Sequence, residues 1–151
     1  MLLLRLPVSK IVPGFTLMEI IVAMAIAAIL FSIGLPMTLS LLRSYSLKSE
    51  RDILVSLLEQ ARDQSLGNVQ EANHGLAVTA ANYVVFQGDS YAARDLIKDL
   101  TYPRAAAVAI SGPSEINFQS ITDANPGGTF ILNANQVQTT VSVNKEGMID
   151  W

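Results

Sequence analysis

The sequence predicts an α+β fold in which a long N-terminal α-helix packs on a small antiparallel β-sheet domain. Residues 20–42 form an apolar run without a charged side chain, and an amphipathic pattern with helical spacing follows it. The rest of the chain consists of short alternating segments separated by turn residues, as in small β-domains. A length of 151 residues leaves room for one such helix and one small domain.

The apolar run is long enough for a membrane-spanning helix. It contains 23 residues, and roughly 20 are needed to cross a hydrocarbon core about 30 Å thick. We therefore expect residues 15–42 to form a transmembrane first half of the helix. Gly34 and Pro36 lie within this segment, and a proline lacks an amide hydrogen and clashes with the preceding turn. These two residues predict a helix kink, either a plain bend in an anchor or a hinge.

Residues 43–67 are predicted to form the amphipathic half of the helix. Charged residues, Glu50 among them, occupy much of the rest of this segment, and Glu59, Arg62 and Asp63 are expected to form a solvated face. Gly67 and Asn68 are a stop signal, because both tolerate the left-handed conformation of a helix C-terminus. A helix over residues 15–66 would be about 75–80 Å long at ~1.5 Å per residue, too long to be covered by one small domain. The apolar positions of the second half recur at three-, four- and seven-residue steps, at Leu47, Leu54, Leu57, Leu58 and Ala61.

Residues 68–151 are predicted to form the β-rich globular domain. Turn signals occur at residues 88–90, 125–128 and 144–147, and residues 91–100 fit either a loop or a short helix that ends before Pro103. The amphipathic half of the helix supplies an apolar face to cover one side of the sheet. About seven short strands are expected, at residues 76–79, 83–86, 105–110, 115–119, 129–132, 136–143 and 148–151.

The charge balance disfavours a nucleic-acid partner. The chain has a net charge of −3 and no cysteine. Residues 1–14 carry Arg5 and Lys10 and no acid, which suggests a leader peptide. Removal of this leader leaves eight basic against thirteen acidic side chains. Such an acidic domain gains little from releasing counterions on a polyphosphate.

Glu19 is the one charge near the start of the apolar segment. A lone carboxylate at membrane depth costs on the order of 2.5–3.5 kcal/mol, so it is expected to have a functional partner. A cut between Gly14 and Phe15 would create an α-amine on Phe15 with an ordinary pKa of roughly 7.7–8.0. Glu19 would then lie four residues away on the same helical face, where the carboxylate and the ammonium can neutralise each other.

The stretch from Gly14 to Glu19, followed by a long apolar helix, resembles the class III signal of type IV pilins and type II secretion pseudopilins. The resemblance implies a pilin-like fold and a prepilin peptidase that cuts after Gly14 and methylates Phe15. It also implies that Glu19 guides the subunit into a growing filament, and it places Pro36 where many relatives have a helix-bending proline. In place of the cation that often precedes the glycine, this chain has Pro13.

Two other interpretations of the N-terminus are an ordinary secretory signal and an uncleaved anchor. The segments Ala23-Met24-Ala25 and Ala25-Ile26-Ala27 fit the small-x-small cleavage pattern. Both lie inside the apolar run instead of at its end, and Glu19 would interrupt the hydrophobic segment before them. The prepilin interpretation is therefore favoured.

The C-terminal sequence carries a weaker resemblance. Residues 116–149 are similar to the C-terminal part of H-type minor pseudopilins and their FimT-like minor pilin relatives. The H-type branch implies a low-copy subunit of a short periplasmic filament. Some FimT-like proteins bind DNA through a basic C-terminal region, but the last 45 residues of this chain hold only Lys145 as a cation. Many major type IV pilins close a C-terminal loop with a disulfide, which this chain lacks.

No enzymatic site is predicted. His74 is the only histidine and there is no cysteine, so a thiol site or a His/Cys zinc site cannot be assembled. Asp89, Asp95 and Asp99 do not have the spacing of a calcium loop and are better explained as a charged surface. We therefore expect no catalytic residue, no metal and no cofactor.

The resemblance predicts a minor pseudopilin of type II secretion. It would be a single-pass inner-membrane protein with its C-terminal domain in the periplasm, and it would assemble into a periplasmic pseudopilus or pilus. The implied partners are other pseudopilins or pilins, the prepilin peptidase, the inner-membrane assembly platform and lipid. The alternatives are a FimT-like minor type IV pilin or a membrane-tethered binding domain. The transported substrate, the filament system and the position in the filament are left open.

Overall fold

The computed structural model describes residues 14–119, 127–134 and 137–151, and within the long helix it leaves the side chains of residues 33–43 undescribed. The chain divides into two compact units, Met1–Leu39 and Ser40–Trp151, which we treat separately. The predicted leader, apart from Gly14, lies outside the described residues, as do part of the turn predicted at residues 125–128 and Gln136.

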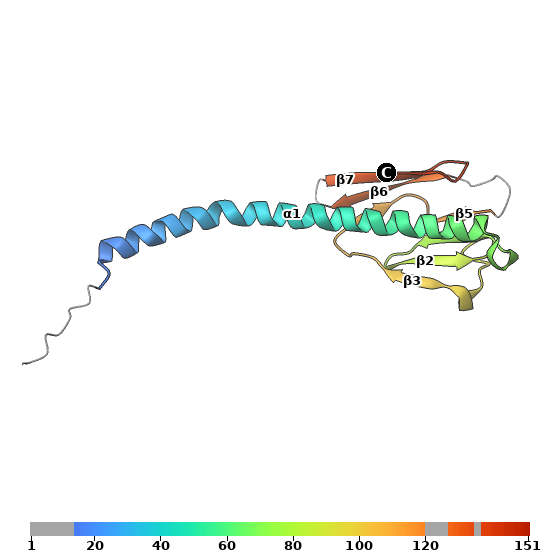
Figure 1. The fold of residues 1–151 in the computed structure, drawn as a ribbon, viewed down its shortest axis with the longest axis horizontal. Coiled ribbons are helices and arrows are strands. Elements are labelled where there is room, and N and C mark those ends of the chain that lie inside the picture. The colour runs from blue at the N-terminus through green and yellow to red at the C-terminus, as the bar shows by residue number, and fades with distance from the viewer. Residues whose placement is uncertain (1–13, 120–126, 135–136) are drawn as a thin grey trace, which may run out of the picture. The chain divides into compact units, whose positions relative to one another are not determined.

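The helix α1 (Leu17–Leu66) contributes residues to both units and is assigned as helical throughout, including Gly34 and Pro36 (Figure 1). The kink at those two residues stays a prediction. Within the part of the chain that the structure describes, no helix is both long enough and apolar enough to cross a membrane. The helix ends as predicted, because Asn68 adopts the left-handed conformation, with φ of 47°.

The strands of the second unit form two four-stranded sheets. The first sheet has the order β3-β2-β1-β5 and the second has the order β4-β6-β7-β8, and all neighbours are antiparallel. The α+β, pilin-like layout is confirmed, with two sheets where the sequence suggested one. The strands are β1 (His74–Val78), β2 (Asn82–Gln87), β3 (Leu100–Pro103), β4 (Ala109–Ser111), β5 (Glu115–Phe118), β6 (Gly128–Ala134), β7 (Val137–Val143) and β8 (Ile149–Asp150).

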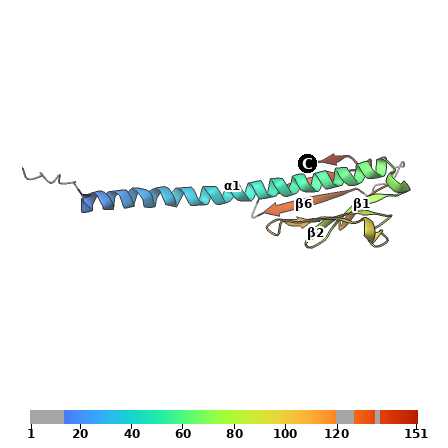
Figure 2. The same cartoon turned by 60° about the horizontal axis from the view of Figure 1, so that its bottom comes forward.

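The hydrophobic core lies where the C-terminal part of α1 crosses both sheets (Figures 1 and 2). The predicted apolar positions of the helix, from Leu47 to Ala61, are all buried. They contact buried side chains of both sheets, such as Ile116 on β5 and Phe130 on β6. A single helical face therefore joins the two sheets into one domain.

A second, smaller cluster covers the other face of the first sheet. Ala77 on β1 and Val84 and Phe86 on β2 are buried there against Tyr91, which comes from the loop after β2. Phe86 and Tyr91 meet edge to face, with ring centroids 5.8 Å apart. Both faces of β1 and β2 are thus covered, which explains why almost every residue in these strands is buried.

One strand was missed and one strand prediction was wrong. Residues 91–100, predicted to be a loop or a short helix, contain the short 3₁₀ turn η2 (Leu96–Lys98), but the strand β3 follows and includes Pro103, which was expected to break the structure there. A proline is tolerated there because β3 is an edge strand and Pro103 is its last residue. Residues 105–108 form a turn in place of a strand, because the Ala105 amide donates to Glu50 Oε1 at 3.1 Å and the Val108 amide donates to the Ala105 carbonyl.

Candidate functional site

The candidate site is the segment from Gly14 to Glu19 at the start of α1. Thr16 is the helix N-cap. Its side-chain Oγ1 accepts a hydrogen bond from the Glu19 amide at 3.2 Å, and its carbonyl accepts the first helical bond, from the Ile20 amide. The sequence analysis did not single out Thr16. A threonine three residues before a glutamate, just ahead of an apolar run, is the signal that identifies such a cap.

The cap places Phe15 outside the helix, which corrects one prediction. We expected the helix to begin at Phe15 and Phe15 to share a helical face with Glu19, but the helix begins at Leu17. The reason is that Thr16 adopts the capping position and satisfies an amide of the first turn. The side chain of Phe15 is 79% exposed. The bond between Gly14 and Phe15 therefore lies outside the helix, ahead of the first helical hydrogen bond.

Gly14 has no packing reason to be a glycine. A Cβ atom built on Gly14 would meet nothing within 4 Å among the residues that the structure describes. Gly75 in β1 is different, because a Cβ there would come within 2.7 Å of the Ile116 carbonyl oxygen. The fold of this chain requires a glycine at position 75 and does not require one at position 14. A requirement at Gly14 would therefore have to come from another molecule.

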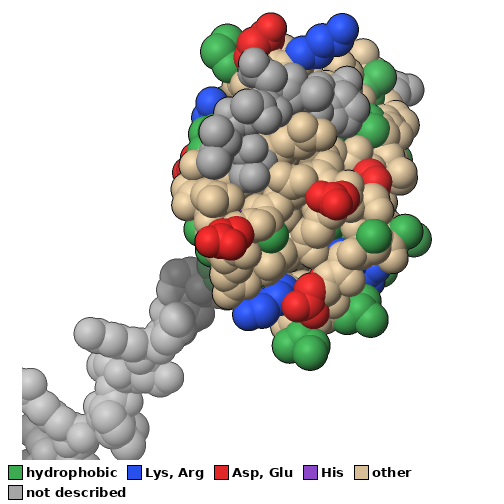
Figure 3. Space-filling view, turned by 90° about the vertical axis from the view of Figure 1, so that its right-hand side faces the viewer, with side chains coloured by type: hydrophobic (Ala, Val, Ile, Leu, Met, Phe, Trp, Pro, Cys, Tyr) green, Lys and Arg blue, Asp and Glu red, His purple; other side chains and the backbone are tan. Residues whose placement is uncertain are grey.

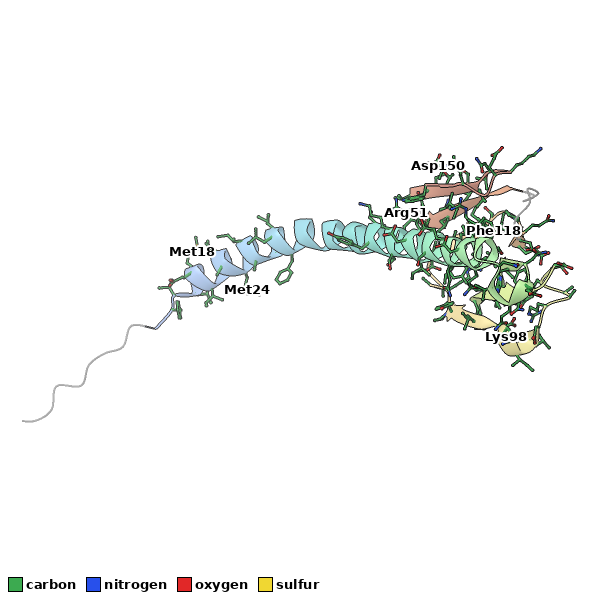
Figure 4. All side chains as sticks on the ribbon, turned by 45° about the vertical axis from the view of Figure 1, so that its right-hand side comes forward. Met18, Met24, Arg51, Lys98, Phe118 and Asp150 are labelled. Carbon is green, nitrogen blue, oxygen red and sulfur yellow. The ribbon has the colours of Figure 1, made fainter. Side chains whose placement is uncertain are left out.

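The helix that follows Gly14 presents apolar side chains on all its faces. Every residue from 14 to 32 is exposed, and Met18 and Met24 project outward from the ribbon (Figure 4). Ser32, the polar interruption in this part, donates its hydroxyl to the Ile29 carbonyl at 2.8 Å. The Ser32 hydroxyl is thus satisfied within the helix, and the hydrophobic surface of this segment is left exposed.

Glu19 lies in the first turn of α1 as its one acidic residue there. The helix macrodipole makes the first turn favourable for a carboxylate. No Lys or Arg occurs in the sequence between Lys10 and Arg43, so no cationic side chain nearby in the sequence can pair with Glu19. A positively charged group supplied by a cut chain end or by a neighbouring molecule would meet this carboxylate at an exposed helix terminus.

Glu50 is a buried charged residue that the sequence analysis did not single out. It is only 3% exposed and lies on the face of α1 that packs against the strands. Its Oε1 accepts hydrogen bonds from the Tyr83 hydroxyl at 2.9 Å and from the Ala105 amide. Burial, together with this bond to Glu50, raises the pKa of the Tyr83 hydroxyl. Glu50 therefore has a structural role, in which it connects α1 to β2 and to the turn after β3.

The remaining titratable candidates make local contacts. Asp89 accepts a hydrogen bond from Asn73, Asp95 caps η2 by accepting from the Ile97 amide, and Asp99 forms an ion pair with Arg94 at 2.8 Å. Among the residues that the structure describes, no group of three or more His, Cys, Asp or Glu side chains is arranged to hold a metal ion.

The comparison with protein families supports the N-terminal motif. Residues 12–35 match the family described as the prokaryotic N-terminal methylation motif. The matched stretch includes Gly14, Phe15 and Glu19 and ends one residue before Pro36. No curated protein and no solved structure matched the chain.

Proposed function

We propose that this chain, whose N-terminal methylation motif supports a type IV pilin-like protein, is a minor pseudopilin, a structural subunit of a type II secretion pseudopilus. In this role it takes part in protein export across the outer membrane. The observation that carries the proposal is the methylation motif at the start of an exposed apolar helix that ends in a compact α+β domain. The proposed work is mechanical and involves no catalysis by this chain.

Processing is proposed to occur between Gly14 and Phe15. A prepilin peptidase would cut after Gly14 and methylate the new amine of Phe15. No atom of the described residues lies within 4 Å of a Cβ built on Gly14, which supports this step because a peptidase could approach that side of the residue without displacing the described chain. A methylated amine remains basic, so the ammonium of Phe15 stays available to pair with the Glu19 carboxylate of the same or a neighbouring subunit, without the shared helical face that was first expected.

Assembly is proposed to bury the exposed apolar surface of α1. Before assembly, residues 15–42 would be held in the inner membrane, with the C-terminal domain in the periplasm. The inner-membrane assembly platform would then transfer the helix from lipid to contacts with the helices of other pseudopilins. A helix that is apolar on every face suits both environments, because neither offers partners for free polar groups.

The minor, H-type assignment rests on the C-terminal pattern. The residues that carry this resemblance, 116–149, form β5, β6, β7 and the start of β8. A FimT-like minor pilin would have the same layout. The single cation in the last 45 residues, Lys145, disfavours the DNA-binding role known from some of those relatives.

The test is the variant Glu19→Ala, with Glu59→Ala as its control because Glu59 is an exposed glutamate on the same helix. We expect Glu19→Ala to insert into the membrane normally but to be excluded from filaments, as measured by co-purification with the other subunits. Glu59→Ala should be incorporated like the wild type. Normal incorporation of Glu19→Ala would show that this carboxylate does not dock the subunit and would overturn the proposed mechanism.

A further inference from the structure

The N-cap residue Thr16 is the second residue after the bond between Gly14 and Phe15. The Thr16 carbonyl accepts the first hydrogen bond of the helix, from the Ile20 amide at 3.2 Å. The helix α1 then begins at Leu17. The position of the cap therefore sets how far the Gly14–Phe15 bond lies ahead of the helix.

Polar side chains that could mark this bond for an enzyme are few. Between residues 14 and 32 they are Thr16, Glu19 and Ser32, and Ser32 donates its hydroxyl locally, to the Ile29 carbonyl. The surface of the second unit is more varied, because Figure 3 shows hydrophobic, acidic and basic side chains interspersed over one of its faces. On the apolar first part of α1, the start of the helix is the feature that distinguishes one peptide bond from the next.

The cleavage proposed above is a hydrolysis. Water adds across the bond, so that Gly14 ends in a carboxylate and Phe15 begins with an amine. During the attack, negative charge develops on the Gly14 carbonyl oxygen, and this oxygen needs hydrogen bonds from the enzyme. A carbonyl oxygen inside a helix already accepts a backbone amide of the next turn. The cap at Thr16 keeps the Gly14 carbonyl ahead of the helical hydrogen bonds, where an enzyme can reach it.

Thr16 is suited to fix the start of the helix. Its Oγ1 accepts the Glu19 amide at 3.2 Å, and threonine is a much better N-cap than alanine or valine. Every residue from 14 to 32 is exposed, so packing within the described chain does not hold the first turn in place. Loss of the cap would leave an amide of the first turn without its acceptor, and the first turn would fray. The bond would then no longer be presented at one fixed position.

We propose that Thr16 is a positioning residue for the cleavage: its cap holds the Gly14–Phe15 bond at a fixed distance ahead of the helix, where the prepilin peptidase binds it. The inference rests on the proposed function, since it takes the cut after Gly14 as given. It is separate from filament docking, because the cap uses the backbone amide of Glu19 and not the carboxylate.

This role predicts which kinetic constant depends on the cap. An enzyme that binds only the capped form has an apparent affinity that falls with the fraction of chains in that form. Once a chain is bound in the capped form, the hydrolysis itself does not involve the Thr16 side chain. Loss of the cap should therefore raise KM and leave kcat nearly unchanged.

The experiment incubates the full-length protein in detergent micelles with a prepilin peptidase and measures kcat and KM from the mass of the cleaved chain. Thr16→Val keeps the branched shape of threonine but has no acceptor, so its KM should rise about two- to tenfold, with kcat within a factor of about two. Thr16→Asn has a different shape but caps well, and both constants should match those of the wild type. Glu19→Ala keeps the amide that Thr16 binds and should also be cleaved like the wild type.

Hydrogen exchange at the Glu19 amide shows whether each variant keeps the cap. Exchange should quicken in Thr16→Val and match the wild type in Thr16→Asn. A Thr16→Val chain with the KM of the wild type, although its Glu19 amide exchanges faster, would overturn the inference. A Thr16→Asn chain with wild-type exchange but a raised KM would also overturn it, because the enzyme would then recognise the threonine itself.

These two outcomes leave the proposed function intact, since the wild-type chain is still cut after Gly14. A wild-type chain that the peptidase does not cut there would overturn the proposed function and the inference together.

Discussion

The two parts of α1 differ in whether the fold of the chain buries their apolar side chains. From residue 14 to residue 32 every residue is exposed, and the side-chain hydrogen bonds of Thr16 and Ser32 are local to the helix. From Leu47 onward the apolar face of the helix is buried against two sheets. The fold of the chain itself accounts for the apolar face of the second part, whereas only the proposed assembly accounts for the apolar surface of the first. The two parts offer matched pairs of residues that can test this difference.

The largest expected effect separates two glycines. Gly14→Val should abolish cleavage after position 14 while leaving the unfolding free energy of the domain unchanged, because the added side chain meets open space. Gly75→Val should lower the unfolding free energy of the domain while leaving cleavage after position 14 unchanged. Its Cβ would press on the Ile116 carbonyl and the Phe86 ring, and overpacking of this kind costs about 1–3 kcal/mol or more.

Electrophoresis of membrane fractions measures the cleavage, and urea unfolding measures the stability. Efficient processing of Gly14→Val would remove the distinction between the two glycines. So would a loss of domain stability in that variant.

The next effect separates two glutamates on the same helix. Glu50→Ala leaves the Tyr83 hydroxyl and the Ala105 amide without their acceptor, and hydrogen bonds to charged groups contribute about 1.5–3 kcal/mol. We expect the free energy of unfolding to fall by that amount. Glu19→Ala should leave the free energy of unfolding unchanged. Glu50→Gln should lose less of it than Glu50→Ala, because the amide oxygen of glutamine still accepts hydrogen bonds. An equal loss for Glu19→Ala and Glu50→Ala would contradict the comparison.

A smaller effect is expected at the cap. Thr16→Ala removes the side-chain acceptor of the Glu19 amide, and loss of an N-cap costs about 0.5–2 kcal/mol. Hydrogen exchange should quicken at the Glu19 and Ile20 amides, with no change in the strands. Thr16→Ser keeps an acceptor and serves as the control. If exchange at these amides is the same in Thr16→Ala as in the wild type, Thr16 does not determine where the helix begins.

The smallest effect concerns pH. Burial lowers the pKa of His74 in the folded protein, so the unfolded chain binds a proton more readily and acid favours unfolding. His74 therefore contributes stability above its unfolded pKa of about 6.5, and this contribution is lost as pH falls through the lower folded value. The charged residues Lys98 and Asp99 line the pocket that His74 also lines. The comparison therefore uses His74→Gln, which leaves both charged residues in place. The variant should lose less stability than the wild type between about pH 7 and pH 5. Parallel pH profiles would contradict this.

The sequence was most informative where one residue pattern decides the structure. The helical spacing of Leu54 and Leu58 identified the buried face, and the stop signal at Gly67 and Asn68 identified the helix end. Strands with clear alternation, such as β7, were placed within about two residues.

The features that the sequence analysis did not predict depend on contacts between residues far apart in the sequence. The burial of Glu50 requires Tyr83 and Ala105, which lie 33 and 55 positions away in the sequence. The strand β3 forms because it pairs with the edge of β2. It was not predicted, because Pro103 was taken as a residue that breaks regular structure. In the candidate site, the motif from Gly14 to Glu19 was recognised. The N-cap at Thr16, a local feature, was present in the sequence and overlooked.

The most direct test of the central claim is the intact mass and N-terminal sequence of the protein isolated from membranes. The account predicts a chain that begins at Phe15 and carries one additional methyl group. A chain that begins at Met1, or that is cut after Ala25 or Ala27, would contradict it. The exposed helix would then be an ordinary anchor or a secretory signal, and the match at residues 12–35 would be accidental.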